Sequence, residues 1–148
     1  MGFVLHHHHL NIHQREREGI VILDLDGRLV MGGGDIALRD FVQSLLDDGN
    51  RQLILNLAKV FEIDTSGNGV LLLLAQQYRD AGGKLALFNI AHAHGKVYEM
   101  ARLEAAVEIY RDELDAVNSF FPDRKAPHYD ILEYIESQAH HEDQTHKS

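Results

Sequence analysis

The sequence contains no cysteine, and this absence excludes several classes of site. Thiol catalysis, thiolate zinc sites, iron–sulfur clusters and disulfides all require that residue. The absence is compatible with a reducing compartment, and we expect a cytoplasmic protein. Basic residues are also few, since 14 Lys and Arg stand against 23 Asp and Glu, for a net charge of −9. That charge repels phosphate backbones and anionic lipid, so we expect neither nucleic acid nor a membrane as a partner.

Long apolar runs are absent too. No stretch approaches the ~20 consecutive apolar residues that span a bilayer. The first ten residues lack the layout of a secretory signal and include the run His6 to His9, so we expect residues 1–10 to be disordered or tag-like. The remaining length and the 45% hydrophobic content are those of one domain with a sizeable core of its own.

Periodicity predicts strands that alternate with helices. Apolar or alternating runs predict strands at residues 11–17, 19–25, 53–57, 84–88 and 107–110. Apolar residues at helical spacing predict helices at residues 35–48, 69–80, 94–101 and from 112 onward, with Asp35 as the N-cap of the first. The second helix is apolar all round, so we expect it to be buried on most sides. This order predicts an α/β fold with an opening hairpin through Glu18 and Gly19, followed by parallel strands with crossover helices.

The last part of the chain differs in pattern. Pro122 and Pro127 bracket a linker, and Ile131, Leu132, Ile135 and Ala139 then form one apolar stripe at helical spacing. We therefore expect a domain at residues 11–121 and a C-terminal appendage at 122–148, formed by a linker and an amphipathic helix. Such a short helix needs a surface to cover its stripe, either on this domain or on a second copy.

The segment from Ile63 to Gly69 (Ile-Asp-Thr-Ser-Gly-Asn-Gly) interrupts apolar sequence between a strand and a helix. One interpretation is local: Asp, Thr and Ser are good N-caps, and glycine permits close packing of a helix start. The other is functional, because a hydroxyl at a helix N-terminus lies where backbone N–H groups and the helix dipole would stabilise an added phosphate.

Residues 11–121 resemble a STAS domain of the bacterial anti-sigma factor antagonist family. The resemblance rests on a few short motifs: Gly27-Arg28-Leu29, Leu53 to Leu57 with Val60 and Ile63, Asp64-Thr65-Ser66-Gly67-x-Gly69, Ala81 to Leu85, and Val107-x-Ile109-Tyr110. The chain departs from the family pattern in three places: threonine stands where serine is commoner, Asn68 replaces an apolar residue, and Gly27-Arg28-Leu29-Val30 lacks the usual acids.

The resemblance implies a phosphorylation-switched binding protein and no enzyme. It implies that Thr65 is the phosphoacceptor, with Ser66 as the alternative, and that the partner binds across Asp64, Thr65, Ser66, Gly67, Asn68 and Gly69. The partners it implies are a Ser/Thr kinase-type anti-sigma factor, sequestered by the unphosphorylated form, and a Ser/Thr phosphatase. It leaves a homodimer open. The main alternative is a STAS subunit of a transport system that binds its partner without phosphorylation.

Other candidate sites are weaker. The loop from Gly32 to Gly34 matches neither phosphate-binding fingerprint and is most simply a turn before a helix, although a small-molecule sensor could use it. His92 and His94 lack a third ligand at fixed spacing, so we expect no metal site. No catalytic triad order, zinc-protease motif or nucleophile elbow occurs, and we expect no cofactor.

Overall fold

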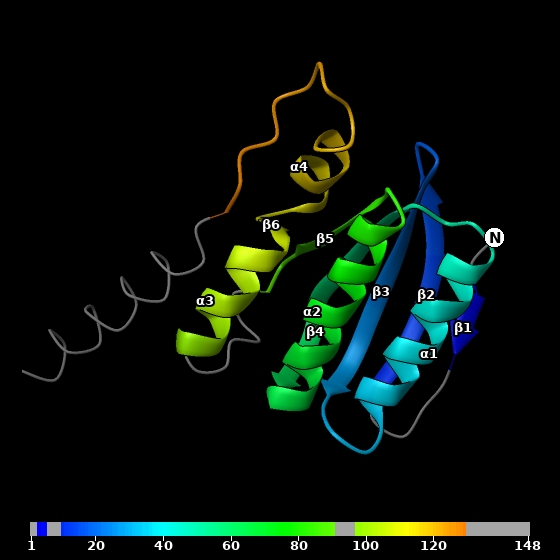
Figure 1. The fold of residues 1–148 in the computed structure, drawn as a ribbon, viewed down its shortest axis with the longest axis vertical. Coiled ribbons are helices and arrows are strands. Elements are labelled where there is room, and N and C mark those ends of the chain that lie inside the picture. The colour runs from blue at the N-terminus through cyan, green and yellow to red at the C-terminus, as the bar shows by residue number, and fades with distance from the viewer. Residues whose placement is uncertain (1–2, 6–9, 91–96, 130–148) are drawn as a thin grey trace, which may run out of the picture.

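The computed structural model describes residues 3–5, 10–90 and 97–129 (Figure 1). Within these described ranges, six strands form one sheet: β1 (Phe3–Leu5), β2 (Leu10–Arg17), β3 (Ile20–Leu29), β4 (Gln52–Ile63), β5 (Lys84–Phe88) and β6 (Glu108–Tyr110). In the same part of the chain, each of four helices follows a strand: α1 (Gly34–Asp47), α2 (Thr65–Asp80), α3 (Val97–Ala106) and α4 (Glu113–Asn118). The alternation of strands and helices predicted from periodicity is confirmed.

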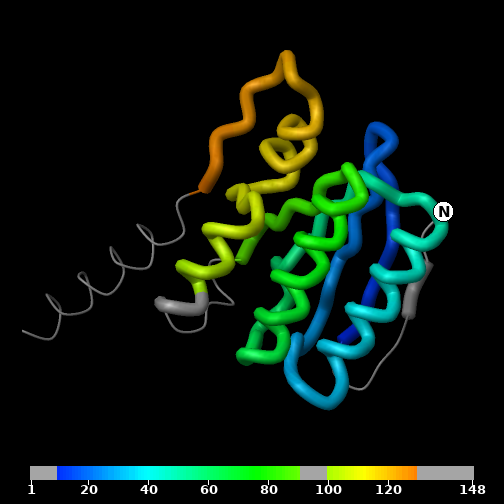
Figure 2. The backbone as a smooth tube through the Cα atoms, viewed as in Figure 1, coloured from blue at the N-terminus to red at the C-terminus, as the bar shows by residue number. Residues whose placement is uncertain are grey.

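The strands lie in the sheet in the order in which they occur in the chain. β1, β2 and β3 pair antiparallel, and β3 to β6 pair parallel, so the sheet is mixed as predicted. The tube in Figure 2 shows the hairpin between β2 and β3 and the crossover helices that join the parallel strands. The hairpin turns at Glu18 and Gly19, whose φ angles of 50° and 83° are those that a two-residue turn of this hand requires.

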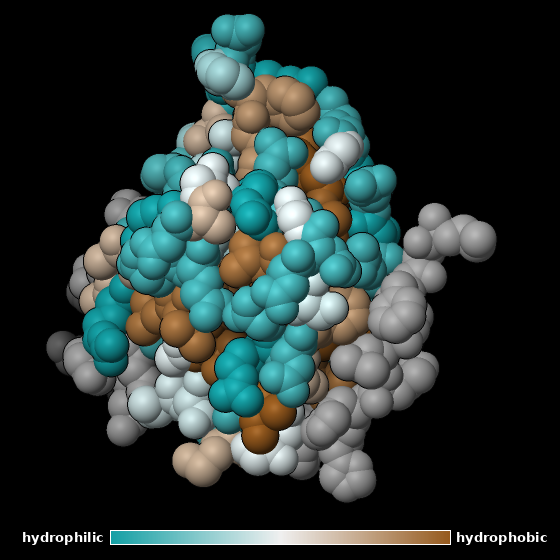
Figure 3. Space-filling view, turned by 45° about the vertical axis from the view of Figure 1, so that its right-hand side comes forward, coloured by the Kyte–Doolittle hydropathy of each residue, from teal (hydrophilic) through white to brown (hydrophobic). Residues whose placement is uncertain are grey.

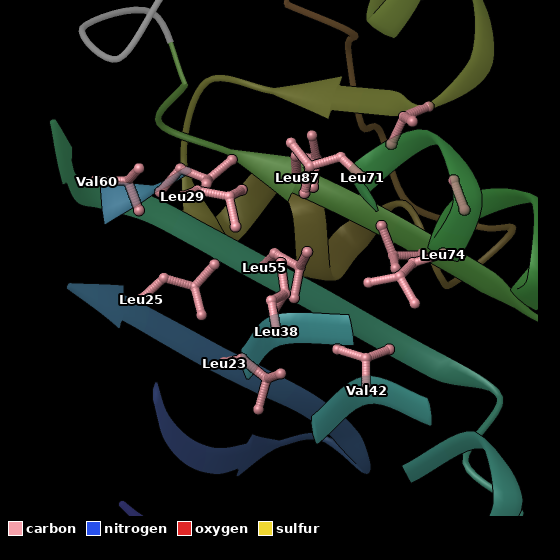
Figure 4. Close-up of a cluster of buried hydrophobic side chains, with 14 of the residues drawn as sticks. Leu23, Leu25, Leu29, Leu38, Val42, Leu55, Val60, Leu71, Leu74 and Leu87 are labelled. Atoms are coloured by element: carbon pink, nitrogen blue, oxygen red, sulfur yellow. The ribbon is translucent and has the colours of Figure 1, made fainter. Parts of the chain in front are cut away.

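The sheet has two different faces, because side chains alternate along each strand. Leucine and valine side chains from β3, β4 and β5 meet those of α1 and α2 in the main core (Figure 4). The opposite face has a smaller cluster that α4 covers, which contains Ile20, Ile22, Ile54, Ala86, Phe88, Tyr110, Ala116 and Val117. The larger core therefore holds α1 and α2 on one face of the sheet.

The N-terminal ten residues differ from the expectation. Phe3–Leu5 form β1, which pairs antiparallel with β2, and Leu10 begins β2 with 1% of its surface exposed. The run His6 to His9 lies outside the described residues. A strand of three residues carries too little periodicity to be recognised, since its pairing depends on the neighbouring strand.

Three local features of helices α1 and α2 differ from what the sequence predicts. Gly33, not Asp35, is the N-cap of α1, and the Asp35 carboxylate instead accepts hydrogen bonds from the backbone N–H groups of Gly33 and Ile36. Helix α2 begins at Thr65, four residues earlier than expected. It is not buried all round, because Leu73 lies on its outer face with 44% exposure.

Residues after Phe121 also pack against the domain, although the sequence predicts that the domain ends at Phe121. Phe120, Phe121 and Ala126 pack against the smaller core cluster. Arg124 pairs with Glu18 in the β2–β3 turn at 2.9 Å. The predicted amphipathic helix at Ile131 to Ala139 lies outside the described residues.

Candidate functional site

The segment from Asp64 to Gly69 lies at the end of the sheet where β3 and β4 finish. Both α1 and α2 begin at this end, at the bottom of Figure 1. The carboxyl ends of parallel strands are the usual place for binding sites in α/β proteins, and the positive ends of two helix dipoles meet here. The topology therefore brings the motif and the loop from Val30 to Gly33 together.

Asp64 is the N-cap of α2 and holds the neighbouring loop. Its Oδ1 accepts a hydrogen bond of 2.8 Å from the Gly67 N–H, and its Oδ2 accepts one of 3.0 Å from the Met31 N–H. The two bonds join the first turn of α2 to the segment that follows β3. Asp64 thus has a structural role, and capping does not fall to the hydroxyl residues after it.

Gly67 and Asn68 face the protein interior. A Cβ at Gly67 would lie 2.0 Å from the carbonyl oxygen of Leu29, so only glycine permits this contact between α2 and the end of β3. Asn68 is 3% exposed. Its side chain is therefore buried, whereas the sequence places Asn68 among the predicted partner-binding residues.

Thr65 and Gly69 lie on the outer side of α2, one turn apart, and both are exposed. A Cβ at Gly69 would meet no atom within 4 Å. Ser66 is half-buried, so its hydroxyl is less accessible than that of Thr65. Of the six predicted binding residues, Thr65 and Gly69 are the two that the structure places fully on the surface.

Exposed apolar side chains occur at the same end of the sheet as the start of α2. Met31 is 71% exposed and adjoins Asp64 through its backbone, and Phe61 at the end of β4 is 62% exposed with Arg28 over its ring at 5.3 Å. Ile36, in the first turn of α1, is 44% exposed. Figure 3 shows apolar residues, in brown, reaching the surface at this lower end of the molecule. We call Met31, Ile36 and Phe61 the apolar rim.

The apolar rim is not recognisable in the sequence. Exposed apolar residues grouped at one place are typical of an interaction surface, but in a sequence they look like core residues. The one signal was position: Met31 breaks the polar glycine loop, and Phe61 falls between a strand and the motif.

The structure gives little support for a ligand site at the glycine loop from Gly32 to Gly34. A Cβ at Gly34 would lie 2.0 Å from the Arg28 carbonyl oxygen, so this glycine serves the packing of α1 on β3. His92 and His94 lie outside the described residues. Within the described ranges, no three His, Asp or Glu side chains come together as a metal ion would require. The helices in these same ranges are too short or too polar to cross a membrane.

A charged cluster on the opposite face ties α4 to the sheet. Arg15 donates to Asp24 at 2.7 Å and also to Glu113 at the start of α4, which Arg17 reaches at 2.6 Å. Hydrogen bonds from Arg15, and then from Arg17, hold the pKa of Glu113 below its usual value despite partial burial. Burial alone would raise the pKa of Asp24, but hydrogen bonds from Arg15 and Asn56 outweigh it and leave the pKa lowered. These ion pairs hold the start of α4 against β2 and β3.

Comparisons with known proteins agree with this architecture. The family model of the STAS domain matches residues 11–116. An anti-sigma factor antagonist from Mycobacterium paratuberculosis aligns at 15% identity with a TM-score of 0.60, over 80% of this chain and 93% of that one. The unphosphorylated form of the anti-sigma factor antagonist SpoIIAA aligns at 16% identity with a TM-score of 0.58, over 77% and 98%. At these identities the likeness shows the fold.

A transporter shares the fold as well. The murine solute carrier 26 family member A9, an anion transporter, aligns at 23% identity with a TM-score of 0.51. The match covers 70% of this chain and 18% of the transporter. One fold thus occurs in both settings, and the fold alone does not discriminate between them.

Proposed function

The chain belongs to the STAS domain family, and from that premise we propose that it is an anti-sigma factor antagonist switched by phosphorylation of Thr65. The observation that carries the proposal is the placement of Thr65: it is the exposed first residue of α2, directly after a capping aspartate that fixes the helix start. In its unphosphorylated form the protein sequesters a kinase-type anti-sigma factor and so releases a sigma factor. The protein acts by binding and is not an enzyme.

The position of Thr65 explains how one phosphate switches binding without unfolding the protein. A phosphate adds about −1.5 to −2 charge at neutral pH. At the N-terminus of α2 this charge is favourable, because the helix dipole and the first N–H groups oppose it. On a surface that a partner must cover, the same charge must be desolvated, so docking fails while the fold stays intact.

The apolar rim supports a protein partner at this surface. Met31, Ile36 and Phe61 expose apolar area at the same end of the sheet as Thr65, and exposed apolar area of this kind is typical of a surface that binds another protein. SpoIIAA has been solved in both unphosphorylated and phosphorylated forms, so one such protein of this fold exists in both states. A phosphatase that restores the threonine would complete the cycle.

Phosphorylation of purified protein tests the proposal. The chain is incubated with Mg-ATP and each kinase-type anti-sigma protein encoded in the same genome, and the intact mass is measured. We expect one added phosphate on the wild type and on Ser66→Ala, and none on Thr65→Ala. Label that persists on Thr65→Ala and disappears on Ser66→Ala would move the acceptor to Ser66.

Binding provides the second arm of this test. Thr65→Glu should weaken binding of the kinase about tenfold or more, and so should Phe61→Asp in the apolar rim. Ser44→Glu, an exposed position on α1, is the matched control and should bind as the wild type does. Equal binding by all four proteins would place the partner elsewhere.

The transporter likeness supports a second candidate, a STAS subunit that binds its transport partner constitutively. In that case Thr65 would never carry phosphate, and Thr65→Glu would be no more harmful than any other charge at the interface. The kinase assay therefore separates the two functions.

A further inference from the structure

A groove lies at the opposite end of α2 from Thr65. It has a volume of about 480 Å³ and is bounded by α2, the start of β5, the end of α3, and β6. Ala75, Leu85, Ala105, Val107 and Ile109 give it apolar walls, with Arg79, Lys84, Glu104 and Glu108 at its polar margin. Lys84 and Glu108 pair with each other at 2.7 Å.

The chain itself leads into this groove. The segment after α4 is held along its course, first by the pair between Arg124 and Glu18 and then by Ala126 in the smaller core cluster. At the end of the described chain, the Tyr129 N–H donates a hydrogen bond of 2.9 Å to the carbonyl oxygen of Ile109 in β6. Tyr129 also packs against the main core, and both His128 and Tyr129 line the groove.

We propose that residues 130–139 of the same chain occupy this groove, with Ile131, Leu132, Ile135 and Ala139 against its apolar walls. The first of these residues follows Tyr129 by two positions, so no linker separates the stripe from the groove. Covalent attachment at that distance gives the segment a high effective concentration at the groove. A second copy or another protein would have to compete with it, which is why the chain's own segment is the occupant.

The docked segment also protects an edge of the sheet. β6 is the last strand in the strand order and has three residues, so its outer side is open to pairing with another chain. The bond from Tyr129 to Ile109 already occupies part of that side. Residues 130–139 extend the cover, and their docking leaves the Thr65 end of the molecule accessible.

The absence of cysteine permits a clean crosslinking test on the full-length chain. Cysteines are introduced as the pair Ala105→Cys and Ile135→Cys, one at the exposed end of α3 and one in the stripe, where a thiol is a small apolar group. The matched control is Ser44→Cys with Ile135→Cys, since Ser44 is exposed on α1 and lies away from the groove. Disulfide formation under mild oxidation is followed by intact mass and by non-reducing gels.

We expect the Ala105 pair to form an intramolecular disulfide at least about tenfold faster than the control pair, as monomer. Adding Ile131→Ser and Leu132→Ser should abolish that advantage, because the stripe then loses its apolar contacts. Equal rates for the two pairs would overturn the proposal. Crosslinked dimer formed in preference to monomer would overturn it as well and would assign the groove to a second copy.

Discussion

Adding one methyl group at Gly67 tests how α2 is seated on the sheet beside Thr65. The new Cβ would lie 2.0 Å from the Leu29 carbonyl oxygen and 2.9 Å from its carbon. Backbone atoms cannot rotate away as a side chain can, so α2 and the end of β3 must separate by about 1 Å. Overpacking of this kind costs ~1–3 kcal/mol.

Gly69→Ala is the matched control, because it adds the same methyl group two residues later in the same helix. Nothing lies within 4 Å of a Cβ there, so the variant gains only helix propensity, about 0.5–1 kcal/mol. We expect urea unfolding to show Gly67→Ala less stable than the wild type and Gly69→Ala slightly more stable. In a chain of this size each 1 kcal/mol corresponds to about 2–4 °C in Tm.

The two variants should also differ in phosphorylation. A displaced α2 weakens the contacts that Asp64 makes with Gly67 and Met31, so the kinase should label Gly67→Ala more slowly. If Gly67→Ala proves as stable as Gly69→Ala, the close approach between α2 and Leu29 does not exist in solution. The position of Thr65 at the start of α2 would then be wrong as well, because it depends on this contact.

Three further outcomes follow from the same contacts. Asp64→Ala removes the helix cap and should lower the free energy of unfolding by ~0.5–2 kcal/mol. Asp64→Asn should lower it less, because the amide oxygen can still accept a hydrogen bond from the Gly67 N–H. Equal losses in the two variants would contradict the capping role of Asp64. Because folding lowers the pKa of Glu113, the ionised side chain stabilises the protein at pH values above its usual pKa of 4.5. This contribution is lost as the pH falls through the folded-state pKa, so the stability advantage of the wild type over Glu113→Gln should shrink in acid. An advantage that grows in acid would reverse the sign. Truncation after Phe121 should lower Tm more than truncation after Tyr129, with melting still cooperative, because only the shorter protein loses the pairing of Arg124 with Glu18.

Much of the fold could be predicted because its signals are local. Gly19 adopts its positive φ in the hairpin turn without steric cost, and α4 begins directly after Asp112, where the sequence predicts a helix to start. The strand and helix periods then determine the order of elements. These features depend on a few neighbouring residues, so one sequence is enough to find them.

The remaining features depend on tertiary contacts. The burial of Asn68 follows from how α2 rotates on the sheet, which its leucine-rich sequence leaves ambiguous because apolar residues occupy every side of the helix. From the sequence alone, Met31 and Phe61 would be assigned to the core because they are apolar, whereas both side chains are exposed in the structure. The Asp-Thr-Ser-Gly motif predicts where a candidate site lies, whereas the exposure of the side chains around it could be known only from the structure.

The most direct test of the central claim is the intact mass of this protein isolated from its native cells, with peptide mapping of any modified species. The account predicts a species heavier by about 80 Da, the mass of one phosphate group, with the added group on Thr65. Its proportion should change with the growth conditions that control the sigma factor. A protein that stays unmodified under all conditions, while its partner remains bound, would contradict the phosphorylation switch and support a constitutive STAS subunit.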